Sequence, residues 1–438
     1  MRSFTLDPPS QRLSTLPPDT ASVPPRMRDR KVAHVIFSSL LSPLGGGRTR
    51  ILDETRVLRD KGFSVSIACF VPMHLFLARR RAIRRTSDEL SLESGASVFR
   101  LARLPMTRLG GVRWLSECLG TLGLLLLLKK KRIQLIHCHQ LGAFAMVRRI
   151  QRFIPECKVV LDVHGCGVQE YLYSEKDCAN PRFLDYLSWK ERSALESADW
   201  LVFVSEAMRS HFEREYRRSF ANSTIIPCAV KPAPVADSAQ REALRKQHGL
   251  QGRFVFCYLG SLQPYQLPEE MCLLFRNAMT YEPDAFFFAI THASAELSRI
   301  ARSVGIPPDR FRVVSARHSD TNLLVQLADV GLLLRDDSLV NRVSSPTKFG
   351  EYCMAGVPTI TTSHVGDIST IVEKHGVGVV IPLPAQDQTR VLAPFTHDVK
   401  AQRSLYQERC RDFAMKSWSW DVFGTCLLEV YAKVSPAP

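Results

Sequence analysis

Residues 341–358 read NRVSSPTKFGEYCMAGVP, and they follow the apolar run at residues 330–334. The order of apolar, polar and small residues predicts a strand, a loop, a short helix and a further strand. Ser345 suits the N-cap of that helix and Pro346 its first position, whereas Gly356 is typical of the residue that ends a helix. The stretch therefore predicts a helix that starts in a loop at the carboxyl end of a strand.

Lys348 and Glu351 lie three residues apart in this predicted helix and therefore share one face. Unpaired N–H groups and the helix dipole favour an anion at the helix start, where Lys348 adds a positive charge. Glu351 is placed to accept hydrogen bonds from hydroxyls next to that anion, as on a ribose. The pair indicates a nucleotide diphosphate. A solvated surface helix between two core strands would carry the same residues, so the surrounding sequence has to decide.

The segment at residues 345–358, followed by the turn at residues 365–367, resembles the C-terminal domain of the retaining glycosyltransferases of the GT-B fold, family-4 type. Many members of this family carry two glutamates eight positions apart. Glu351 matches the second of them, and Val343 stands where the first would be. The resemblance spans roughly residues 31–434. It implies an α/β protein with two doubly wound Rossmann-like domains that face each other across a cleft.

The resemblance also implies an activity. The chain is expected to be a retaining, metal-independent glycosyltransferase of the hexosyltransferase type, which moves a sugar from a nucleotide-diphosphate sugar to an acceptor. The expected acceptor is a lipid-linked or cell-surface glycan, as in polysaccharide biosynthesis. The acceptor hydroxyl would attack on the face of the leaving group, and the departing phosphate would take its proton. No protein nucleophile and no cofactor beyond the co-substrate are then expected.

The rest of the chain supports the α/β class because strand and helix signals alternate along it. The predicted strands lie at residues 32–37, 63–70, 96–101, 133–137, 158–163 and 200–204 in the first half and at residues 254–260, 285–290, 311–314, 330–334, 359–361 and 378–381 in the second.

The predicted organisation is a disordered tail at residues 1–30, an N-terminal Rossmann-like acceptor-side domain at residues 31–232, a linker at residues 233–249, a C-terminal Rossmann-like donor-binding domain at residues 250–401 and a closing helix at residues 402–438 that crosses back to the first domain.

Polar residues that follow the strands of the first domain are candidates for its site, because ligands of parallel sheets bind at the carboxyl ends of strands. They are His137, His139, His164, Ser205 and Glu206. His164 resembles the family's histidine that lines the acceptor side of the cleft near the sugar, and we expect it to act in catalysis together with Glu351. Ser205 and Glu206 are better explained as the N-cap and a first-turn residue of a helix.

Gly45, Gly46 and Gly47 form a glycine-rich loop after the first predicted strand. The loop lacks the spacing of a dinucleotide fingerprint or a Walker loop, so alone it indicates only a turn from a strand into a helix. Its position resembles the first glycine loop of the family. The resemblance implies that these glycines lie in the cleft near the donor phosphates.

The predicted diphosphate site departs from the family in its cations. The family often places Arg and Lys after the first strand of the C-terminal domain, and Ser261 and Gln266 stand at those positions. A buried diphosphate without cations is costly. We therefore expect Arg335 and Lys348 to hold the donor, with Ser345 at the helix start and a neutral hydrogen bond from Gln266.

The chain has 438 residues and a formal charge of +15, which favours an anionic partner. Nucleic acid is not the expected partner, because the sequence has no platform of interleaved aromatic and basic residues. Twelve cysteines without a CxxC pair or a preceding signal peptide predict reduced thiols in the cytoplasm. His137 and His139 do not predict a metal site, because no further Cys or His cluster completes one in the sequence.

Residues 115–132 contain a leucine run that ends in Lys129, Lys130, Lys131 and Arg132. The run is too short to span a bilayer. It predicts either a buried helix that packs on the sheet or an interfacial helix whose basic end meets anionic lipid. Together with the formal charge of +15, it motivates the prediction of peripheral contact with the inner face of an anionic membrane. The basic stretch at residues 79–85 is a second basic patch, of a kind that is usually a solvated face.

Three rival functions share some of these features. A GT-B epimerase or hydrolase of nucleotide sugars would turn the donor over without an acceptor. A catalytically dead scaffold, suggested by the absent cations and first glutamate, would bind nucleotide sugar without turnover. A Rossmann oxidoreductase is disfavoured, because no glycine loop has dinucleotide spacing followed by an acidic partner for the ribose.

Overall fold

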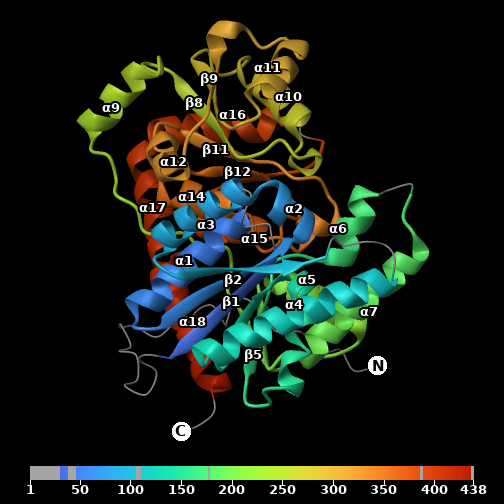
Figure 1. The fold of residues 1–438 in the computed structure, drawn as a ribbon. Coiled ribbons are helices and arrows are strands. Elements are labelled where there is room, and N and C mark those ends of the chain that lie inside the picture. Colours follow the sequence, from blue (N-terminus) through green and yellow to red (C-terminus); the bar gives the residue numbers. More distant parts are fainter. Residues whose placement is uncertain (1–29, 38–45, 105–109, 176–177, 385–387, 436–438) are drawn as a thin grey trace, which may run out of the picture.

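The computed structural model of the chain describes residues 30–37, 46–104, 110–175, 178–384 and 388–435. Residues 1–29 of the predicted tail, and Gly45, lie outside these ranges. The described residues form two parallel sheets, one in each half of the chain, with helices against their faces (Figure 1). The predicted α/β class with two doubly wound domains is confirmed.

Seven parallel strands form the N-terminal sheet, in the order β3-β2-β1-β4-β5-β6-β7. They are β1 (Lys31–Phe37), β2 (Ser64–Pro72), β3 (Ser97–Arg103), β4 (Leu135–His139), β5 (Lys158–Val163), β6 (Trp200–Phe203) and β7 (Ser223–Ile225). The central strands are buried on both faces and therefore read as continuous apolar runs in the sequence. The three-residue β7 is only half-buried and was not predicted.

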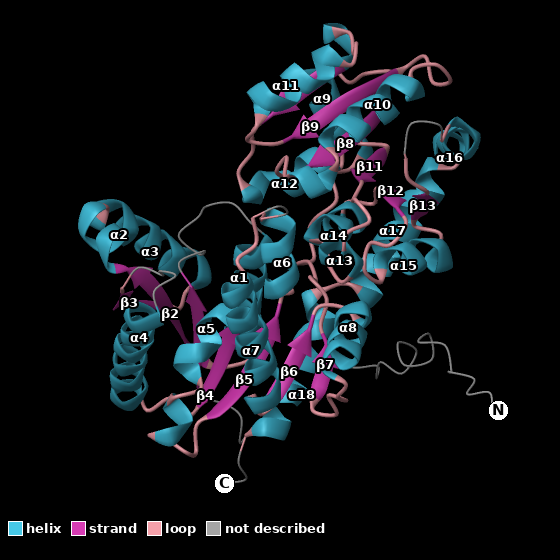
Figure 2. Cartoon of the chain, turned by 90° about the vertical axis from the view of Figure 1, so that its right-hand side faces the viewer, coloured by secondary structure: helices cyan, strands magenta, loops and turns pink. Residues whose placement is uncertain are grey.

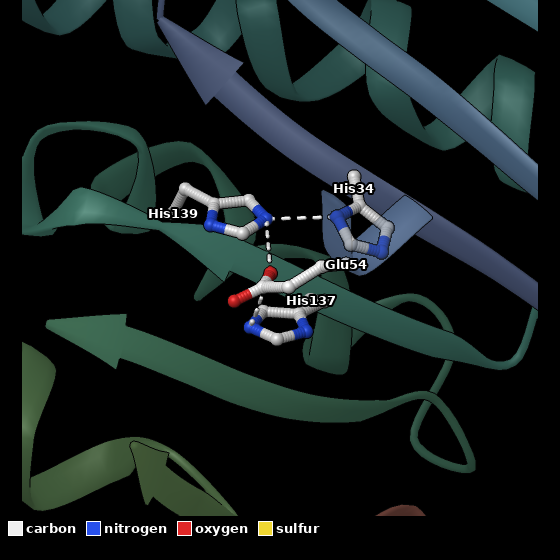
Figure 3. A group of neighbouring side chains, drawn as sticks. All are labelled: His34, Glu54, His137 and His139. Carbon is white, nitrogen blue, oxygen red and sulfur yellow. Dashed lines mark hydrogen bonds and ion pairs between the residues drawn. The ribbon is translucent and has the colours of Figure 1, made fainter. Parts of the chain in front are cut away.

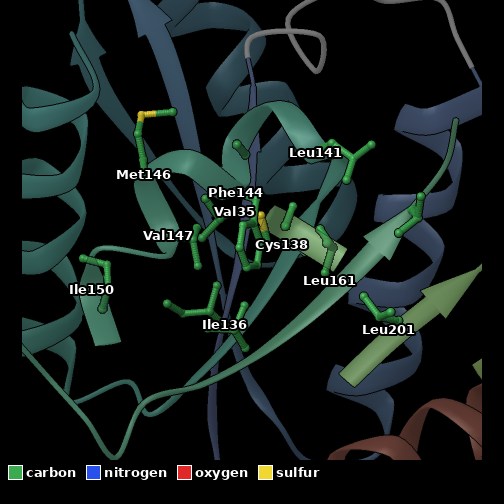
Figure 4. Packing of buried hydrophobic residues seen from close by; sticks show 14 of the residues in the cluster. Val35, Ile136, Cys138, Leu141, Phe144, Met146, Val147, Ile150, Leu161 and Leu201 are labelled. Atoms are coloured by element: carbon green, nitrogen blue, oxygen red, sulfur yellow. The ribbon is translucent and has the colours of Figure 1, made fainter. Parts of the chain in front are cut away.

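Helices cover both faces of this sheet. They are α1 (Gly46–Asp60), α2 (Met73–Ala78), α3 (Arg80–Ser94), α4 (Gly110–Lys131), α5 (Gln140–Val147), α6 (Gly167–Ser174), α7 (Pro181–Ser197) and α8 (Glu206–Tyr216), with a 3-10 turn at Ile150–Arg152. Side chains of α5, such as Phe144 and Val147, bury one face of the sheet (Figure 4). Leu128 of α4 belongs to the same core. Side chains of α1 and α3, such as Ile51 and Leu90, bury the other.

The C-terminal sheet has six parallel strands in the order β10-β9-β8-β11-β12-β13. They are β8 (Phe254–Leu259), β9 (Ala285–Ile290), β10 (Phe311–Val314), β11 (Val330–Leu333), β12 (Thr359–Thr362) and β13 (Gly378–Ile381). The helices are α10 (Pro268–Ala278), α11 (Ser294–Ser303), α12 (His318–Val325), α13 (Leu339–Arg342), α14 (Thr347–Met354), α15 (Ile368–His375) and α16 (Thr389–Ala401), with 3-10 turns at Pro264–Gln266 and Pro308–Arg310.

The predicted linker at residues 233–249 contains a helix that was not predicted, α9 (Ser238–Gln247). Asp237 caps this helix by accepting a hydrogen bond from the backbone N–H of Gln240 at 2.7 Å. Arg245 is buried and donates to the carbonyl oxygen of Leu327 at 2.7 Å. The helix is so polar that its sequence resembles a solvated connection, yet its arginines attach it to the second domain.

The predicted closing helix at residues 402–438 is two helices, α17 (Arg403–Ser417) and α18 (Trp420–Val434). Helix α17 packs into the core of the C-terminal domain, whereas α18 packs on the N-terminal domain and runs along it (Figure 1). The chain crosses between the domains at Ser419, where it runs parallel to the earlier crossing at Val230. Val230 donates to the carbonyl of Trp418 and accepts from the N–H of Trp420, both at 3.0 Å.

Trp420 anchors α18 and its loss should destabilise the whole chain. Its side chain is 1% exposed and packs in the core between α18 and the N-terminal sheet. We expect Trp420→Ala to lower the free energy of unfolding by about 3–5 kcal/mol, because it removes a large buried ring and leaves a cavity. Urea denaturation measures the effect, with Trp114→Ala as the control, since Trp114 is 61% exposed. Equal midpoints for the two variants would contradict the anchoring role.

Candidate active site

The carboxyl ends of the two sheets meet at the junction of the domains. Tyr173 on α6 donates a hydrogen bond to Asp336, which follows β11, at 2.6 Å. The rings of Tyr173 and Tyr265 lie 6.1 Å apart. Ser205 donates to the carbonyl oxygen of Val343 at 2.6 Å. Figure 2 shows α6, α13 and α14 at this junction, so residues that follow strands of both sheets surround one site.

Helix α8 holds a carboxylate of the other domain at its N-terminus. Asp367 accepts hydrogen bonds from the backbone N–H groups of Glu206 and Ala207, at 2.7 and 3.0 Å. Ser205 caps the helix by accepting from the N–H of Met208 at 2.9 Å, which confirms the helix-start positions predicted for Ser205 and Glu206. Because Asp367 already occupies these N–H groups, α8 serves domain contact rather than phosphate binding.

His164 follows β5, as predicted, and forms a hydrogen bond with one member of a buried ion pair. Its Nε2 lies 2.7 Å from Oδ2 of Asp162, while its Nδ1 is buried and has no hydrogen-bond partner in the described residues. Asp162 in turn binds Arg50 of α1 through two hydrogen bonds, of 2.8 and 3.0 Å. A neutral His164 that donates from Nε2 to this carboxylate therefore presents Nδ1 as an acceptor.

The charges around Arg50 are balanced within the protein interior. Burial would raise the pKa of Asp162, but Arg50 and the neighbouring histidines hold it well below its usual value. Burial raises the pKa of Glu54 well above its usual value, although Arg50 lies 3.0 Å away and opposes the shift. Arg50 thus lies between Asp162, whose ionised form is favoured, and Glu54, whose protonated form is favoured.

A cluster of imidazoles adjoins this ion pair, and its members come from β1, α1 and β4 (Figure 3). It contains His34, Glu54, His137 and His139, all buried. His34 Nδ1 lies 2.8 Å from His139 Nε2, and His137 Nδ1 lies 2.7 Å from the hydroxyl of Tyr431 on α18. The expectation that no cluster completes the pair His137 and His139 was therefore wrong, because β1 lies beside β4 in the sheet and brings His34 to them.

The cluster has donors of the right kind for a transition metal, and its ligand atoms lie within 4.8 Å of one another. The rings of His137 and His139, however, stack at a centroid distance of 4.5 Å and an angle of 7°. A histidine holds an ion along a nitrogen lone pair in the plane of its ring, and stacked parallel rings do not direct their lone pairs to one point. The arrangement fits a hydrogen-bonded cluster and does not fit a metal site.

The described glycines of the predicted loop belong to the first turn of α1 rather than to a loop, since the helix begins at Gly46. A side chain added at Gly47 would place its Cβ 4.0 Å from Nδ1 of His164. The start of α1 therefore lies next to the unpartnered nitrogen of His164. Gly45 lies outside the described residues.

Lys348 is buried beneath Gly260 in the C-terminal domain, where it contacts Gln266. Its ammonium donates to Oε1 of Gln266 and to the hydroxyl of Tyr258, the latter at 3.1 Å. A Cβ at Gly260 would lie 2.5 Å from Cε of Lys348, so only glycine fits there. Burial, and then the charge of Arg335, lower the pKa of Lys348 well below its usual value. Lys348 thus lies near a second cation and is held by neutral oxygen atoms.

Arg335 follows β11 and is 8% exposed. Its guanidinium carbon lies 4.9 Å from the ring centroid of Tyr265, and its Nε is buried without a hydrogen-bond partner in the described residues. Burial lowers its pKa. Within the described chain no carboxylate lies at ion-pair distance from Arg335 or Lys348, which distinguishes them from the balanced Arg50.

The start of α14 differs in detail from the prediction. The helix begins at Thr347, its N-cap is Pro346, and the cap makes no side-chain hydrogen bond. The predicted cap, Ser345, is buried and accepts a hydrogen bond from the backbone N–H of Cys228 at 3.1 Å, so it joins the two domains instead. Glu351 lies on α14 as predicted and is half-buried.

The residues that support His164 were not predicted from the sequence. Arg50 and Glu54 were not singled out, although their spacing of four residues on a predicted helix places them on one face. Two charged residues on the otherwise apolar face of α1 that packs against the sheet are the sequence signal that could have identified Arg50 and Glu54. His34 gave no signal, because it stands in the middle of an apolar run.

Comparison with known proteins supports the predicted resemblance. Residues 44–233 match the model of a family described as Glycosyltransferase Family 4. Solved structures with the same fold include HepE of Anabaena in complex with UDP, with 14% identity, a TM-score of 0.69 and coverage of 92% of this chain and 100% of that one. A glycosyltransferase of Rickettsia africae has 13% identity, a TM-score of 0.68 and coverage of 94% and 100%.

A third similar structure is WaaG, described as a glycosyltransferase involved in lipopolysaccharide biosynthesis, with 14% identity, a TM-score of 0.63 and coverage of 91% and 99%. No curated protein sequence matches the chain. The family match and the shared fold confirm the resemblance to GT-B glycosyltransferases of the family-4 type. The matched residues lie in the N-terminal domain, whereas the motif that first indicated the family lies in the C-terminal one.

Acid should weaken the fold through the buried histidines. Burial lowers the pKa of His34, His137 and His139, so below about pH 6.5 they bind protons more readily in the unfolded chain than in the folded one. The free energy of unfolding therefore decreases as the pH is lowered, by up to about 1.4 kcal/mol per pH unit for each histidine. Burial raises the pKa of Glu54, and it raises that of Glu191 to about 7, so these two carboxyl groups act in the opposite sense and each offsets up to about one of the three histidines.

Urea unfolding at about pH 7.5 and about pH 5.5 tests this expectation. The variant His34→Gln should show a smaller loss of stability between the two conditions, whereas His397→Gln, at an exposed position, should behave like the unaltered chain. The same stability at both pH values would mean that the buried histidines titrate as they do in the unfolded chain.

Proposed function

We propose that the protein is a glycosyltransferase that moves a sugar from a nucleotide-diphosphate donor to a glycan acceptor, with retained configuration and without a metal ion. The observation that carries the proposal is the pair of buried cations, Arg335 and Lys348, near the carboxyl ends of the second sheet. Burial lowers the pKa of both, and the charges of Asp336 and Glu351 oppose these two shifts without reversing them. An anion placed between them would relieve two unfavourable charges at once.

A diphosphate is the anion that this pair fits best. Lys348 and Arg335 lie close enough for their charges to interact, and the start of α14 carries Lys348 in its first turn. Glu351, one turn further, is positioned for the ribose hydroxyls of a bound nucleotide. HepE, which shares the fold, has been crystallised with UDP and with UDP-glucose, so these are the first nucleotides to test here.

His164 is the group that we assign to the sugar. Asp162 fixes its Nε2 at 2.7 Å, and Nδ1 points toward the first turn of α1 beside Gly47. In this tautomer Nδ1 accepts a hydrogen bond from a hydroxyl of the sugar or of the acceptor. Asp162 and Arg50 act as positioning residues, since they hold the imidazole and do not reach the sugar themselves.

In the proposed reaction the bond between the anomeric carbon and the diphosphate breaks as the acceptor hydroxyl bonds to the same face of that carbon. The proton of the hydroxyl passes to the departing phosphate. Arg335 and Lys348 stabilise the charge that develops on the leaving diphosphate, which is the task that a metal ion performs in other transferases. Activity retained in the presence of a chelator, and an unchanged anomeric configuration in the product, would be consistent with this course.

The proposed acceptor is a lipid-linked or cell-surface glycan, and the proposed place of reaction is the cytoplasmic face of a membrane. The exposed leucines and cations of α4 support this location. None of the described helices is long and apolar enough to cross a membrane. The membrane contact that we propose is peripheral.

The diphosphate site should lose affinity when either cation is removed. We expect Arg335→Ala and Lys348→Ala each to weaken UDP binding by roughly tenfold to a hundredfold, because a charge-assisted hydrogen bond contributes about 1.5–3 kcal/mol. Gln266→Ala should have a smaller effect, since Gln266 is neutral and already bonded to Lys348. Isothermal titration calorimetry measures the constants. Arg299→Ala, at an exposed position on α11, is the matched control for loss of one arginine.

Wild-type affinity in both cation variants would exclude the pair as the diphosphate site. If UDP and UDP-glucose fail to bind the unaltered protein, other nucleoside diphosphates have to be tried, and failure of all of them would exclude the proposed function. Binding without any turnover would favour the scaffold, and turnover of the donor alone would favour a hydrolase or epimerase.

Glu351 and His164 should affect transfer more than folding. We expect Glu351→Gln to reduce donor affinity by roughly tenfold or more, because it weakens charged hydrogen bonds to the ribose. His164→Ala should reduce the turnover number with little change in nucleotide affinity, since His164 faces the sugar and not the phosphates. Steady-state kinetics with UDP-glucose and thermal denaturation of each variant separate these effects. Unchanged kinetics in folded variants would remove both residues from the site.

A further inference from the structure

Helix α4 presents a stripe of leucines to solvent at the free edge of the N-terminal sheet. Leu115, Leu119, Leu122 and Leu126 are 45%, 39%, 53% and 61% exposed, and their spacing of four, three and four residues puts them on one side of the helix. The opposite side, with Leu124 and Leu128, is buried against the sheet. The predicted packing on the sheet therefore holds for the buried side of α4, and the interfacial interpretation concerns only its exposed side.

The stripe is too regular to be the scattered apolar surface of an ordinary soluble protein. Contiguous exposed apolar patches of this kind mark interaction sites. The one acidic residue of α4, Glu117, is turned aside, where it pairs with Arg149 at 3.1 Å and accepts from Tyr186 at 3.0 Å. The leucine stripe thus contains no negative charge.

Cations continue from the end of the stripe around the edge of the sheet. Lys129, Lys130 and Arg132 are exposed at the C-terminal end of α4, and the ammonium of Lys131 lies 5.3 Å over the ring of Phe99 on β3. The next residue of that edge strand, Arg100, lies on the other side of the sheet. Figure 2 shows α2, α3 and α4 together at this end of the N-terminal domain.

On that other side a small pocket gathers three guanidinium groups. Its volume is about 110 Å³, and it is lined by Phe76, Arg80, Ile83, Arg84 and Arg100. The nearest carboxylate in the described chain is that of Asp88, 3.9 Å from Arg84, and both of these side chains are largely exposed. A pocket with apolar walls and three weakly compensated arginines suits a phosphate group.

We infer that this edge, formed by α3, β3 and α4 and called here the docking edge, lies on the surface of an anionic lipid bilayer. The leucine stripe enters the boundary between headgroups and acyl chains, and the cations bind lipid phosphates, with one headgroup in the arginine pocket. Apolar area and positive charge at one edge of the domain are the two signals that together hold a protein on a bilayer. The inference identifies the surface that serves the proposed location of the reaction.

A second copy of the chain is the other partner that an exposed leucine stripe fits. Two copies joined through α4 would bring their lysine and arginine groups to a common interface in which the stripe offers no carboxylate. Like charges brought together without a partner oppose association. Charge complementarity therefore favours the bilayer over self-association.

The test measures sedimentation of the full chain with vesicles of phosphatidylcholine and phosphatidylglycerol in equal parts, at low and high salt. Leu122→Ser/Leu126→Ser and Arg80→Gln/Arg100→Gln should each reduce vesicle affinity by roughly tenfold or more. The matched controls lie in the C-terminal domain: Val391→Ser/Leu405→Ser changes two exposed apolar residues, and Arg299→Gln/Lys374→Gln removes the same charge. They should bind like the unaltered chain, and binding should weaken with salt and on pure phosphatidylcholine.

Failure of the unaltered chain to sediment with anionic vesicles at low salt would overturn the inference. Equal losses in the docking-edge variants and their controls would overturn it too, since net charge or general hydrophobicity would then explain binding. A dimer in sedimentation velocity that Leu122→Ser/Leu126→Ser dissociates, without vesicle binding, would assign the stripe to self-association. UDP binding measured on the same samples separates this inference from the proposed function, because either can fail while the other stands.

Discussion

The N-terminal half of the site depends on the buried ion pair between Arg50 and Asp162. Its two hydrogen bonds join α1 to β5, and Arg50 also donates to the carbonyl oxygen of Pro227, where the chain leaves the first domain. Removing one partner of such a pair leaves an unpaired charge in the interior, which typically costs about 3–5 kcal/mol. His164 is therefore oriented by an interaction whose loss would damage the fold as well as the site.

The buried charges on the two sides of the candidate site are arranged differently. In the first domain the charge of Arg50 is matched by Asp162, and the neighbouring histidines have lowered pKa values. In the second domain Arg335 and Lys348 share a small region without a carboxylate at ion-pair distance in the described chain. A balanced interior is typical of a rigid support, whereas unbalanced buried cations are typical of a site that is completed by its ligand.

The sequence predicted the fold well because buried parallel strands appear as apolar runs of strand length. It failed where structure depends on which strands are neighbours. His34 lies within such a run, and only the pairing of β1 with β4 brings it to His139. Helix α9 was missed because its contacts are made by polar side chains. The predicted closing helix is interrupted at Ser419 because the chain pairs there with the first crossing, which local propensity does not reveal.

The two connections between the domains run side by side, and this restricts how the domains can move relative to each other. Val230 is bonded on both sides of Ser419, so the two connections behave as one tied hinge rather than as two independent tethers. Domain movement that leaves these bonds intact is rotation about that hinge, with little sliding. The hydrogen bond between Tyr173 and Asp336, worth about 1 kcal/mol, is one of several that join the domains in addition to the hinge, since Ser205 and Asp367 form others. Rotation about the hinge therefore has to break these bonds together.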